Sequence, residues 1–493
     1  MGFSPHFRCM TPLLILLVIG LYFAMLIGVS WFTGRNSDNQ SFFLANKSAP
    51  WYVVAFGMIG ASLSGVTFIS IPGTVGTQSM SYMQLVLGYL LGYWVIMGVL
   101  LPLYYRLNLT SIYAYLQQRF GFWSHRTGAS FFLLSRTIGS SFRLYLVAMV
   151  LDRFVFSAWG VPFWLTVVVT IVLIWLYTFR SGIKTIIWTD TLQTFFLIGA
   201  VLLSIGIIGQ ELELDLNGLV KTVADSPRSQ WFFWDWESPQ YFWKMFFSGA
   251  FITIVMTGLD QDMMQKNLSC RSLADAQKNM FWFSLVLVAV NLLFMSLGVL
   301  LFAYAETKGI AIPKSTDELF PMLALQHFAP IAGFTFIIGL IAAAYSSADS
   351  ALAALTTSFC VDFLGFTPQK GDVRTRMKVH VGMSVVLGLQ ILLFHSLHND
   401  ALITQLFKVA GYTYGPLLGL FAFGLFTRRK VKDGWVPVVA VLSPLICYIL
   451  QLNSKTWLGG YTFGFELLIL NGALTFGGLW LLRLPKTEEI EKR

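Results

Sequence analysis

The stretch at residues 342–358, which reads AAAYSSADSALAALTTS, carries polar side chains inside an otherwise apolar segment. Within five residues it holds three hydroxyls and one carboxylate, those of Ser346, Ser347, Asp349 and Ser350. On a helix these side chains share neighbouring faces, and the surrounding alanines let a second helix approach closely. In a membrane helix this stretch would form one half of an oxygen-lined cation site.

A second stretch at residues 57–76 reads GMIGASLSGVTFISIPGTVG and mixes glycine and proline with hydroxyl residues. Glycine and proline at this density favour a broken helix whose freed carbonyls face a cavity. The alternative is a kinked, closely packed helix whose hydroxyls bond back to its own carbonyls.

Several charged residues lie inside apolar segments, where each costs about 2.5–3.5 kcal/mol on insertion scales and therefore needs a reason. Arg136 and Arg143 are seven residues apart, nearly on one helix face. They either pair with an acid such as Asp349 or bind a substrate carboxylate. Asp190 and Asp260 also fall inside predicted spans, and Asp190 either reaches the headgroups or joins a cation route.

The composition places these residues in a membrane protein. Of 493 residues, 56% are hydrophobic and 12% are charged, against roughly 25% charged in soluble domains. We expect an all-α polytopic protein with thirteen spans, because thirteen apolar segments are long enough to cross a bilayer. An N-terminus outside and a C-terminus inside would place most lysines and arginines in cytoplasmic loops. Because cytoplasmic loops usually carry this excess, we expect that orientation. The net charge of +9 is thus a topology signal rather than a nucleic-acid footprint.

Other function classes lack their motifs. The four cysteines give neither a disulfide framework nor metal-ligand spacing, and the six histidines form no catalytic cluster. The sequence contains no GxxxxGK[ST] loop and no loop long enough for a soluble domain. We therefore expect no enzyme activity and no transport powered by this chain's own ATP hydrolysis.

Four motifs together resemble the sodium:solute symporter family, which includes sodium-coupled glucose, proline, pantothenate and sialic-acid transporters. They are ASLSGVTFISIPG, IKTIIWTDTLQ, LDQDMMQK and AAAYSSADSALAALTTSFCVDF. The resemblance covers roughly residues 10–485. It implies a LeuT-type fold in the plasma membrane, with two inverted five-helix repeats at residues 51–210 and 240–427, a leading helix at 10–35 and two trailing helices at 433–484.

The resemblance also implies two cation sites. Sodium as coupling ion would bind the carbonyls of Gly60, Leu63 and Ala343 and the hydroxyls of Ser346 and Ser347. A candidate second site would use Asp190, Asp349 and Ser350. Asp349 stands where the sialic-acid transporter has serine, so its role as sodium ligand, proton carrier or arginine partner stays open.

The substrate, by the same resemblance, would bind beside the broken helix. The residues implied are Ser62, Ser64, Thr67, Gln84, Asp260 and Gln261, with Arg136 or Arg143 holding a carboxylate.

We therefore predict a sodium-coupled symporter that imports a small polar organic solute (a sugar, a sugar acid or another organic anion) by alternating access. The alternatives are a proton-coupled carrier, with Asp349 or Asp190 as the proton site, and a membrane sensor without net transport. The expected partners are the solute and the lipid bilayer. No protein partner is implied, which is compatible with a monomer.

Overall fold

The computed structural model describes residues 12–34, 38–152, 156, 159–179, 182–397 and 412–484. Within these ranges the chain is helical and forms no strand. The α-helices are α1 (Pro12–Thr33), α2 (Asn39–Leu44), α3 (Trp51–Ser62), α4 (Gly65–Gln78), α5 (Tyr82–Val95), α6 (Leu101–Arg106), α7 (Ala114–Arg119), α8 (Phe122–Leu151), α9 (Phe163–Thr178), α10 (Ile183–Glu211), α11 (Leu216–Ala224), α12 (Phe242–Thr253), α13 (Gln261–Leu268), α14 (Leu273–Thr307), α15 (Leu319–Met322), α16 (Pro330–Ser358), α17 (Val373–Leu397), α19 (Tyr414–Phe426), α20 (Val436–Trp457) and α21 (Leu467–Leu481).

Shorter helical turns continue or connect these elements. The π-helical elements that lie wholly within the described residues are η2 (Ile96–Leu100), η6 (Ile254–Gly258), η8 (Leu323–His327) and η9 (Phe359–Phe363). Four are 3₁₀ turns, η1 (Ala45–Lys47), η5 (Pro227–Ser229), η7 (Thr316–Glu318) and η10 (Asp433–Trp435).

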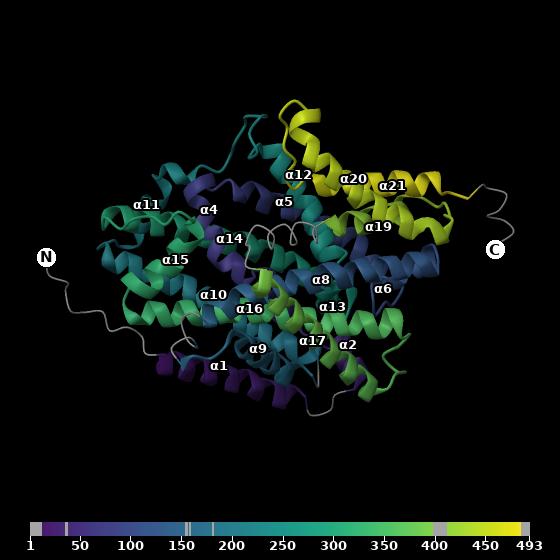
Figure 1. The fold of residues 1–493 in the computed structure, drawn as a ribbon, viewed down its shortest axis with the longest axis horizontal. Coiled ribbons are helices and arrows are strands. Elements are labelled where there is room, and N and C mark those ends of the chain that lie inside the picture. Colours follow the sequence, from purple (N-terminus) through teal and green to yellow (C-terminus); the bar gives the residue numbers. More distant parts are fainter. Residues whose placement is uncertain are drawn as a thin grey trace.

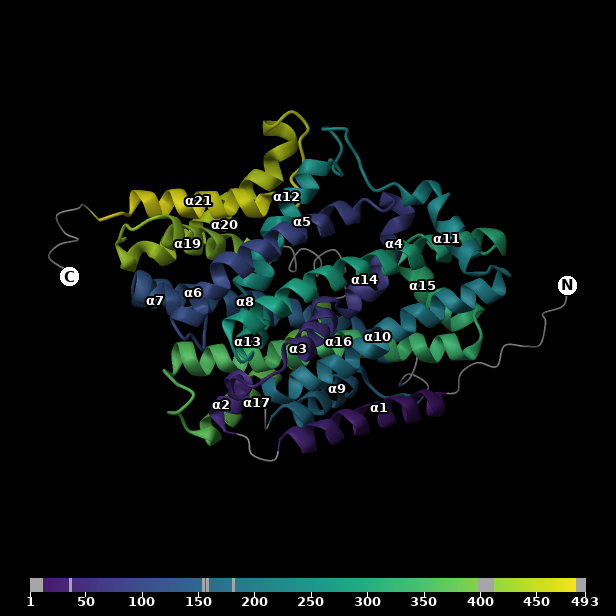
Figure 2. The same cartoon turned by 180° about the vertical axis from the view of Figure 1, so that it is seen from behind.

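The helices form a bundle whose long elements run side by side. In both views α1 lies along one side, and α19, α20 and α21 lie along the opposite side (Figures 1 and 2). By length and composition, seven helices among the described residues can cross a membrane, or nine if each of two bent pairs is one span. Large apolar side chains such as Leu389 on α17 and Leu442 on α20 are exposed, as lipid-facing positions require.

The centre of the bundle is α16, which packs most extensively on α10 and also contacts α3, α4 and α8. Every residue from 339 to 358 is buried. The alanines of this segment allow the close approach, since small side chains let helix backbones come together. The polar stretch identified in the sequence is therefore surrounded by other helices on all sides.

Two helix pairs are bent at a break, as the glycine-rich sequence predicts for the first of them. The α3–α4 pair bends by 59°, and α12 with η6 bends against α13 by 65°. At the first break Leu63 and Ser64 leave helical geometry, and the Ser64 hydroxyl accepts the Thr67 amide to cap α4. At the second break the Asp260 carboxylate caps α13 by accepting the Asp262 amide. A capped break leaves carbonyls at the end of the preceding half-helix without partners in that helix.

Candidate cation and substrate sites

The Ser347 hydroxyl on α16 faces the end of α3 at its break, and the Ser346 hydroxyl faces Asp190 of α10. The Ser347 hydroxyl donates to the Ala61 carbonyl, with 3.3 Å between the oxygens. Ala61 belongs to the last turn of α3, whose carbonyls lack helical amide partners. Two stretches separated by nearly three hundred residues thus meet in one buried place, as the sequence analysis expected.

Both hydroxyls donate their protons to protein oxygens. The Ser346 hydroxyl donates its proton to Asp190 Oδ1 at 2.6 Å, and the Ser347 proton points to Ala61. A hydroxyl whose proton is already donated can turn its lone pairs toward a cation. Neutral hydroxyl and carbonyl oxygens are hard ligands that suit sodium, and the residues expected to supply them are Gly60, Leu63, Ala343, Ser346 and Ser347.

Behind Ser346 lies a group of buried ionisable residues. Lys266 Nζ forms an ion pair with Asp190 Oδ2 at 2.6 Å, and both side chains are 1% exposed. The Ser350 hydroxyl donates to the same Asp190 oxygen at 3.4 Å. Asp349 accepts hydrogen bonds from the Ser350 amide at 2.6 Å and from the Tyr177 hydroxyl at 2.9 Å. Asp190, Asp349 and Ser350, the residues of the expected second cation site, therefore lie together. The Lys266 ammonium, however, already lies against Asp190.

Neither arginine contacts Asp349, so the arginine-partner alternative differs from the structure. Arg136 forms an ion pair with Asp262, and its Nη1 lies 3.7 Å from Asp260 Oδ2. Tyr414 donates a further hydrogen bond to Asp260 at 3.2 Å. The break at Asp260 explains the arrangement, because it turns both aspartates toward α8.

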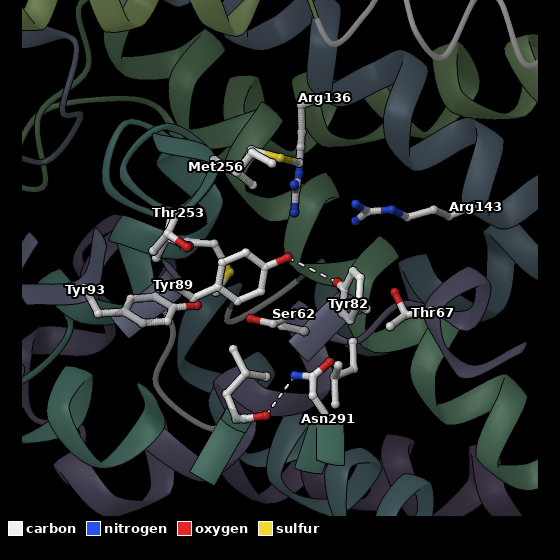
Figure 3. A pocket seen from close by; sticks show the side chains of 16 residues that line it. Ser62, Thr67, Tyr82, Tyr89, Tyr93, Arg136, Arg143, Thr253, Met256 and Asn291 are labelled. Carbon is white, nitrogen blue, oxygen red and sulfur yellow. Dashed lines mark hydrogen bonds between the residues drawn. The ribbon is translucent and has the colours of Figure 1, made fainter. Parts of the chain in front are cut away.

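On the other side of the α3–α4 break lies a cavity of about 140 Å³ (Figure 3). Its wall combines aromatic, hydroxyl, amide and guanidinium groups. The lining residues are Ala61, Ser62, Leu63, Thr67, Tyr82, Tyr89, Tyr93, Arg136, Arg143, Ile252, Thr253, Met256, Thr257, Met263, Leu287 and Asn291. A buried space with a few convergent polar groups is the usual form of a small-molecule site.

Arg143 is the polar group of this cavity whose charge is least compensated. Its guanidinium points into the space between Arg136 and Thr67 (Figure 3). Among the described residues no carboxylate lies within 4 Å of it, whereas Arg136 is committed to Asp262. A guanidinium in a cavity with unused donors can bind a carboxylate through two parallel hydrogen bonds.

The cavity continues into a larger one of about 610 Å³ that the connection between α20 and α21 partly lines. The two share six lining residues: Tyr82, Tyr89, Arg136, Arg143, Ile252 and Met256. The hydroxyls of Tyr82 and Tyr89 are 3.1 Å apart and are hydrogen-bonded to each other where the two spaces meet. This tyrosine pair separates an inner polar space from an outer, more apolar one.

The chain is similar in sequence to several characterised transporters. The sodium/sialic acid symporter NanT of Aliivibrio fischeri is 24% identical over 464 residues, which are 89% of this chain and 87% of NanT. The human sodium-coupled monocarboxylate transporter 1 is 25% identical over 464 residues, 91% of this chain and 72% of the relative. A profile of the sodium:solute symporter family matches residues 42–437.

The chain belongs to the sodium:solute symporter family. Sodium is therefore its coupling ion, and it is a multi-pass membrane protein that transports a solute. These statements confirm the function predicted from the sequence.

Solved structures show the symporter's fold. A sodium-coupled sialic acid symporter in a substrate-bound outward-open state superimposes with a TM-score of 0.79 at 21% identity, covering 95% of this chain and 97% of that one. The nucleobase-cation-symport-1 transporter Mhp1 superimposes with a TM-score of 0.53 at 13% identity, covering 90% and 92%. The symporter thus has the LeuT-type fold that the motifs implied.

Four of the eight residues expected around the substrate line the inner cavity: Ser62, Thr67, Arg136 and Arg143. The other four have different positions. Gln84 is buried and holds the loop before α12, donating to the Gln240 carbonyl and accepting from the Phe233 amide. Gln261 bonds the backbone of Thr110 and Ile112. Ser64 caps α4, and Asp260 caps α13.

Several residues of the symporter's sites were missed by sequence reasoning. Lys266 looked like an ordinary cation near a membrane face, because it follows Asp262 by one helical turn and could have paired with it there. Tyr82, Tyr89, Tyr93 and Tyr177 looked like the aromatic background of a chain with 16% aromatic residues. The break between η6 and α13 was the one signal for Lys266. A half-helix that begins at a capped break lies deeper in the bundle than the end of a continuous span.

Proposed function

We propose that this symporter imports a small hydroxylated organic acid, such as a sugar acid, together with sodium. The observation that carries the proposal is Arg143, a guanidinium that points into the cavity beside the α3–α4 break without a carboxylate partner in the described structure. An anionic solute supplies the missing partner. The hydroxyl and amide groups around it suit a solute that carries several hydroxyls.

The proposed first sodium site consists of the carbonyls of Gly60, Leu63 and Ala343 and the hydroxyls of Ser346 and Ser347. It lies on one face of the break, and the cavity lies on the other. Ala61, which accepts a hydrogen bond from Ser347, also lines the cavity. Sodium that fixes this turn therefore fixes part of the solute site, and the two affinities are reciprocally coupled.

The energetics suffice for accumulation. A membrane potential of 100 mV supplies about 2.3 kcal/mol per charge. A tenfold sodium gradient adds about 1.4 kcal/mol. One sodium ion carried with a monovalent anion moves no net charge, so the membrane potential adds no net driving force. The tenfold sodium gradient alone then supports about a tenfold solute gradient, because every ~1.4 kcal/mol corresponds to a factor of ten.

The names of the similar proteins agree with a carboxylate solute. NanT is named for sialic acid and the human relative for monocarboxylates, and each of these solutes carries a carboxylate. The inner cavity is small, but it opens past Tyr82 and Tyr89 into the larger one. A displacement of this tyrosine pair would extend the polar space toward a solute of sugar size.

We propose a thirteen-span arrangement in the plasma membrane with the N-terminus outside and the C-terminus inside. The spans would be α1, α3–α4, α5 with η2 and α6, α8, α9, α10, α12–α13, α14, α16, α17, α19, α20 and α21. Residues 51–210 and 240–427 would be the inverted repeats. In this orientation the larger cavity faces outward, which supports an outward-facing form of the alternating-access cycle. We expect this cycle to need no other protein subunit.

The test is solute binding to the purified protein, measured by thermal stabilisation in sodium and in potassium buffer. We expect stabilisation by sialic acid or a smaller hydroxy acid in sodium only, and none by the corresponding methyl ester. Arg143→Gln should shift this stabilisation to at least about tenfold higher solute concentrations, while Arg126→Gln on the same helix, outside the cavity, should leave it unchanged. Equal stabilisation by acid and ester would contradict the proposal, and so would full binding by Arg143→Gln.

A further inference from the structure

Asn291 on α14 is a buried polar residue in the wall of the inner cavity. Its side-chain nitrogen donates to the Leu287 carbonyl of the same helix at 2.7 Å. Its side-chain oxygen, Oδ1, has no hydrogen-bond partner among the described residues, and the residue is only 2% exposed. Buried polar atoms are rarely left unsatisfied, so this oxygen indicates a place for a ligand group.

The contact with Leu287 determines which end of the Asn291 amide is free. A carbonyl oxygen accepts a hydrogen bond only from a donor, so the amide nitrogen faces Leu287. Turning the amide around would place two acceptor oxygens against each other. The free end is therefore the oxygen, which accepts hydrogen bonds and donates none.

This oxygen differs from the other polar side-chain groups of the inner cavity. Among the lining residues of the described structure, the serine, threonine and tyrosine hydroxyls both donate and accept, whereas the two guanidiniums only donate. Asn291 supplies the only amide or carboxylate oxygen in that set. A solute group that donates a hydrogen bond therefore finds a dedicated acceptor at Asn291.

Arg143 and Asn291 reach the cavity from different helices, α8 and α14. In Figure 3 they point into the cavity from opposite sides. With the carboxylate of a bound acid at Arg143, the opposite end of the solute lies toward Asn291. A keto or carboxylate oxygen there would face the lone pairs of Oδ1, whereas a hydroxyl would donate its proton to them. An unfavourable contact of this kind selects between solutes as effectively as a favourable one.

An ammonium group also donates hydrogen bonds, but the cavity gives its charge no partner. No aspartate or glutamate is among the lining residues in the described part of the chain. A buried charge without a partner is costly, whereas a hydroxyl brings a donor without a charge. The cavity therefore favours a hydroxy acid over an amino acid of the same length.

We propose that Asn291 makes the symporter selective for hydroxy acids, because its Oδ1 accepts a hydrogen bond from a solute hydroxyl while Arg143 binds the carboxylate. An acid without that hydroxyl leaves Oδ1 unsatisfied and binds more weakly. The inference rests on the proposed function, since it needs an acid bound at Arg143.

The test compares four-carbon acids by the thermal stabilisation of the purified protein in sodium buffer, as a function of acid concentration. The probes are butyrate, its monohydroxy and keto derivatives and its terminal amino derivative, with sialic acid as a larger probe. We expect at least one hydroxybutyrate to bind about tenfold more tightly than butyrate, since one unsatisfied buried acceptor is removed. The keto and amino derivatives should bind no more tightly than butyrate.

Asn291→Leu keeps a similar side-chain volume and removes the acceptor. It should weaken binding of the preferred hydroxybutyrate, and of sialic acid, about tenfold, and leave butyrate within about twofold. The matched control is Ser284→Ala on the same helix. The buried Ser284 hydroxyl donates to the Phe281 carbonyl at 2.7 Å and does not line the cavity, so this variant should keep the preference.

Equal binding of butyrate and its hydroxy derivatives to the wild type would overturn the inference, and this comparison needs no variant. Tightest binding by the amino derivative would do the same. If sialic acid alone binds, its unchanged affinity in Asn291→Leu, or in Asn291→Ala if the leucine variant does not fold, would overturn it. Absence of stabilisation by every acid would remove the proposed function itself. Acid binding that depends on Arg143 but not on a hydroxyl would remove only the role of Asn291.

Discussion

The two sides of the α3–α4 break have opposite electrostatic deficits. On the α16 side two carboxylates share one ammonium, whereas on the cavity side Arg143 has no carboxylate within ion-pair distance in the described structure. Under the proposed function, sodium would bind on the first side and an organic anion on the second. A single turn of broken helix would then separate the proposed cation site from the proposed anion site.

The largest expected effect comes from breaking the ion pair on the cation side. Asp190→Asn leaves the Lys266 ammonium buried beside a neutral amide, and removing one partner of a buried pair typically costs about 3–5 kcal/mol. Unfolding of the detergent-solubilised protein should therefore shift strongly downward, and the added change Lys266→Met should recover much of the loss. Glu211→Gln, which removes an exposed partner of Lys308, should cost at most about 1 kcal/mol. A fully stable Asp190→Asn would show that the ammonium has another compensating group.

The next effect concerns sodium itself. Ser346→Ala with Ser347→Ala removes two hydroxyl ligands, and we expect the sodium concentration for half-maximal uptake to rise about a hundredfold, or ~2.8 kcal/mol. The control is Ser204→Ala on α10, whose buried hydroxyl bonds only its own helix at Ala200. Sodium dependence that matches this control would remove both serines from the cation side.

The two arginines of the cavity sharpen the comparison on the anion side. Arg143→Gln should weaken solute binding about ten- to a hundredfold, since a charge-assisted hydrogen bond contributes about 1.5–3 kcal/mol, while stability changes little. Arg136→Gln should mainly lower stability, because Asp262 loses its buried partner. Measuring the KM for solute and the unfolding midpoint on both variants separates the two roles. Equal profiles would mean that the arginines act as one unit.

The smallest expected effect on transport is at Gln84. Gln84→Leu removes hydrogen bonds to the Gln240 carbonyl and the Phe233 amide, and leaving such groups unpaired costs about 1–3 kcal/mol of stability. The KM for solute should stay within about twofold, because Gln84 does not line the inner cavity. A large rise in KM would place the substrate nearer to the loop before α12 than the cavity suggests.

The sequence was sufficient where a pattern maps directly onto one element. Gly57, Gly60, Pro72 and Gly73 predicted the break, and the closely spaced Ser346 and Ser347 predicted the helix that faces it. These signals are local, since unwinding follows from residue type and helical faces follow from spacing. The fold then followed from motifs that occur together over most of the chain.

The sequence was insufficient where a side chain had several partners within reach. The side-chain amides of Gln84 and Gln261 can bind a solute as readily as a backbone group. Only the loops packed against them determine which partner they bind. Lys266 had Asp262 one turn away, and only the fold brings Asp190 closer. Such choices depend on tertiary contacts that neither spacing nor composition encodes.

The two halves of the broken helix make polar contacts with different neighbours. On α3, Gly60 donates its amide to Thr194 Oγ1 of α10 at 3.0 Å, and a Cβ at Gly60 would lie 2.4 Å from that oxygen. On α4, Ser70 bonds Asp317 of η7, and the Pro72 carbonyl packs directly on Gly298 of α14. Both halves also pack on α14 and α16, and only the backbone of Leu63 and Ser64 leaves helical geometry between them. Under the proposed function, sodium and solute would thus both bind against this one short bend of the chain.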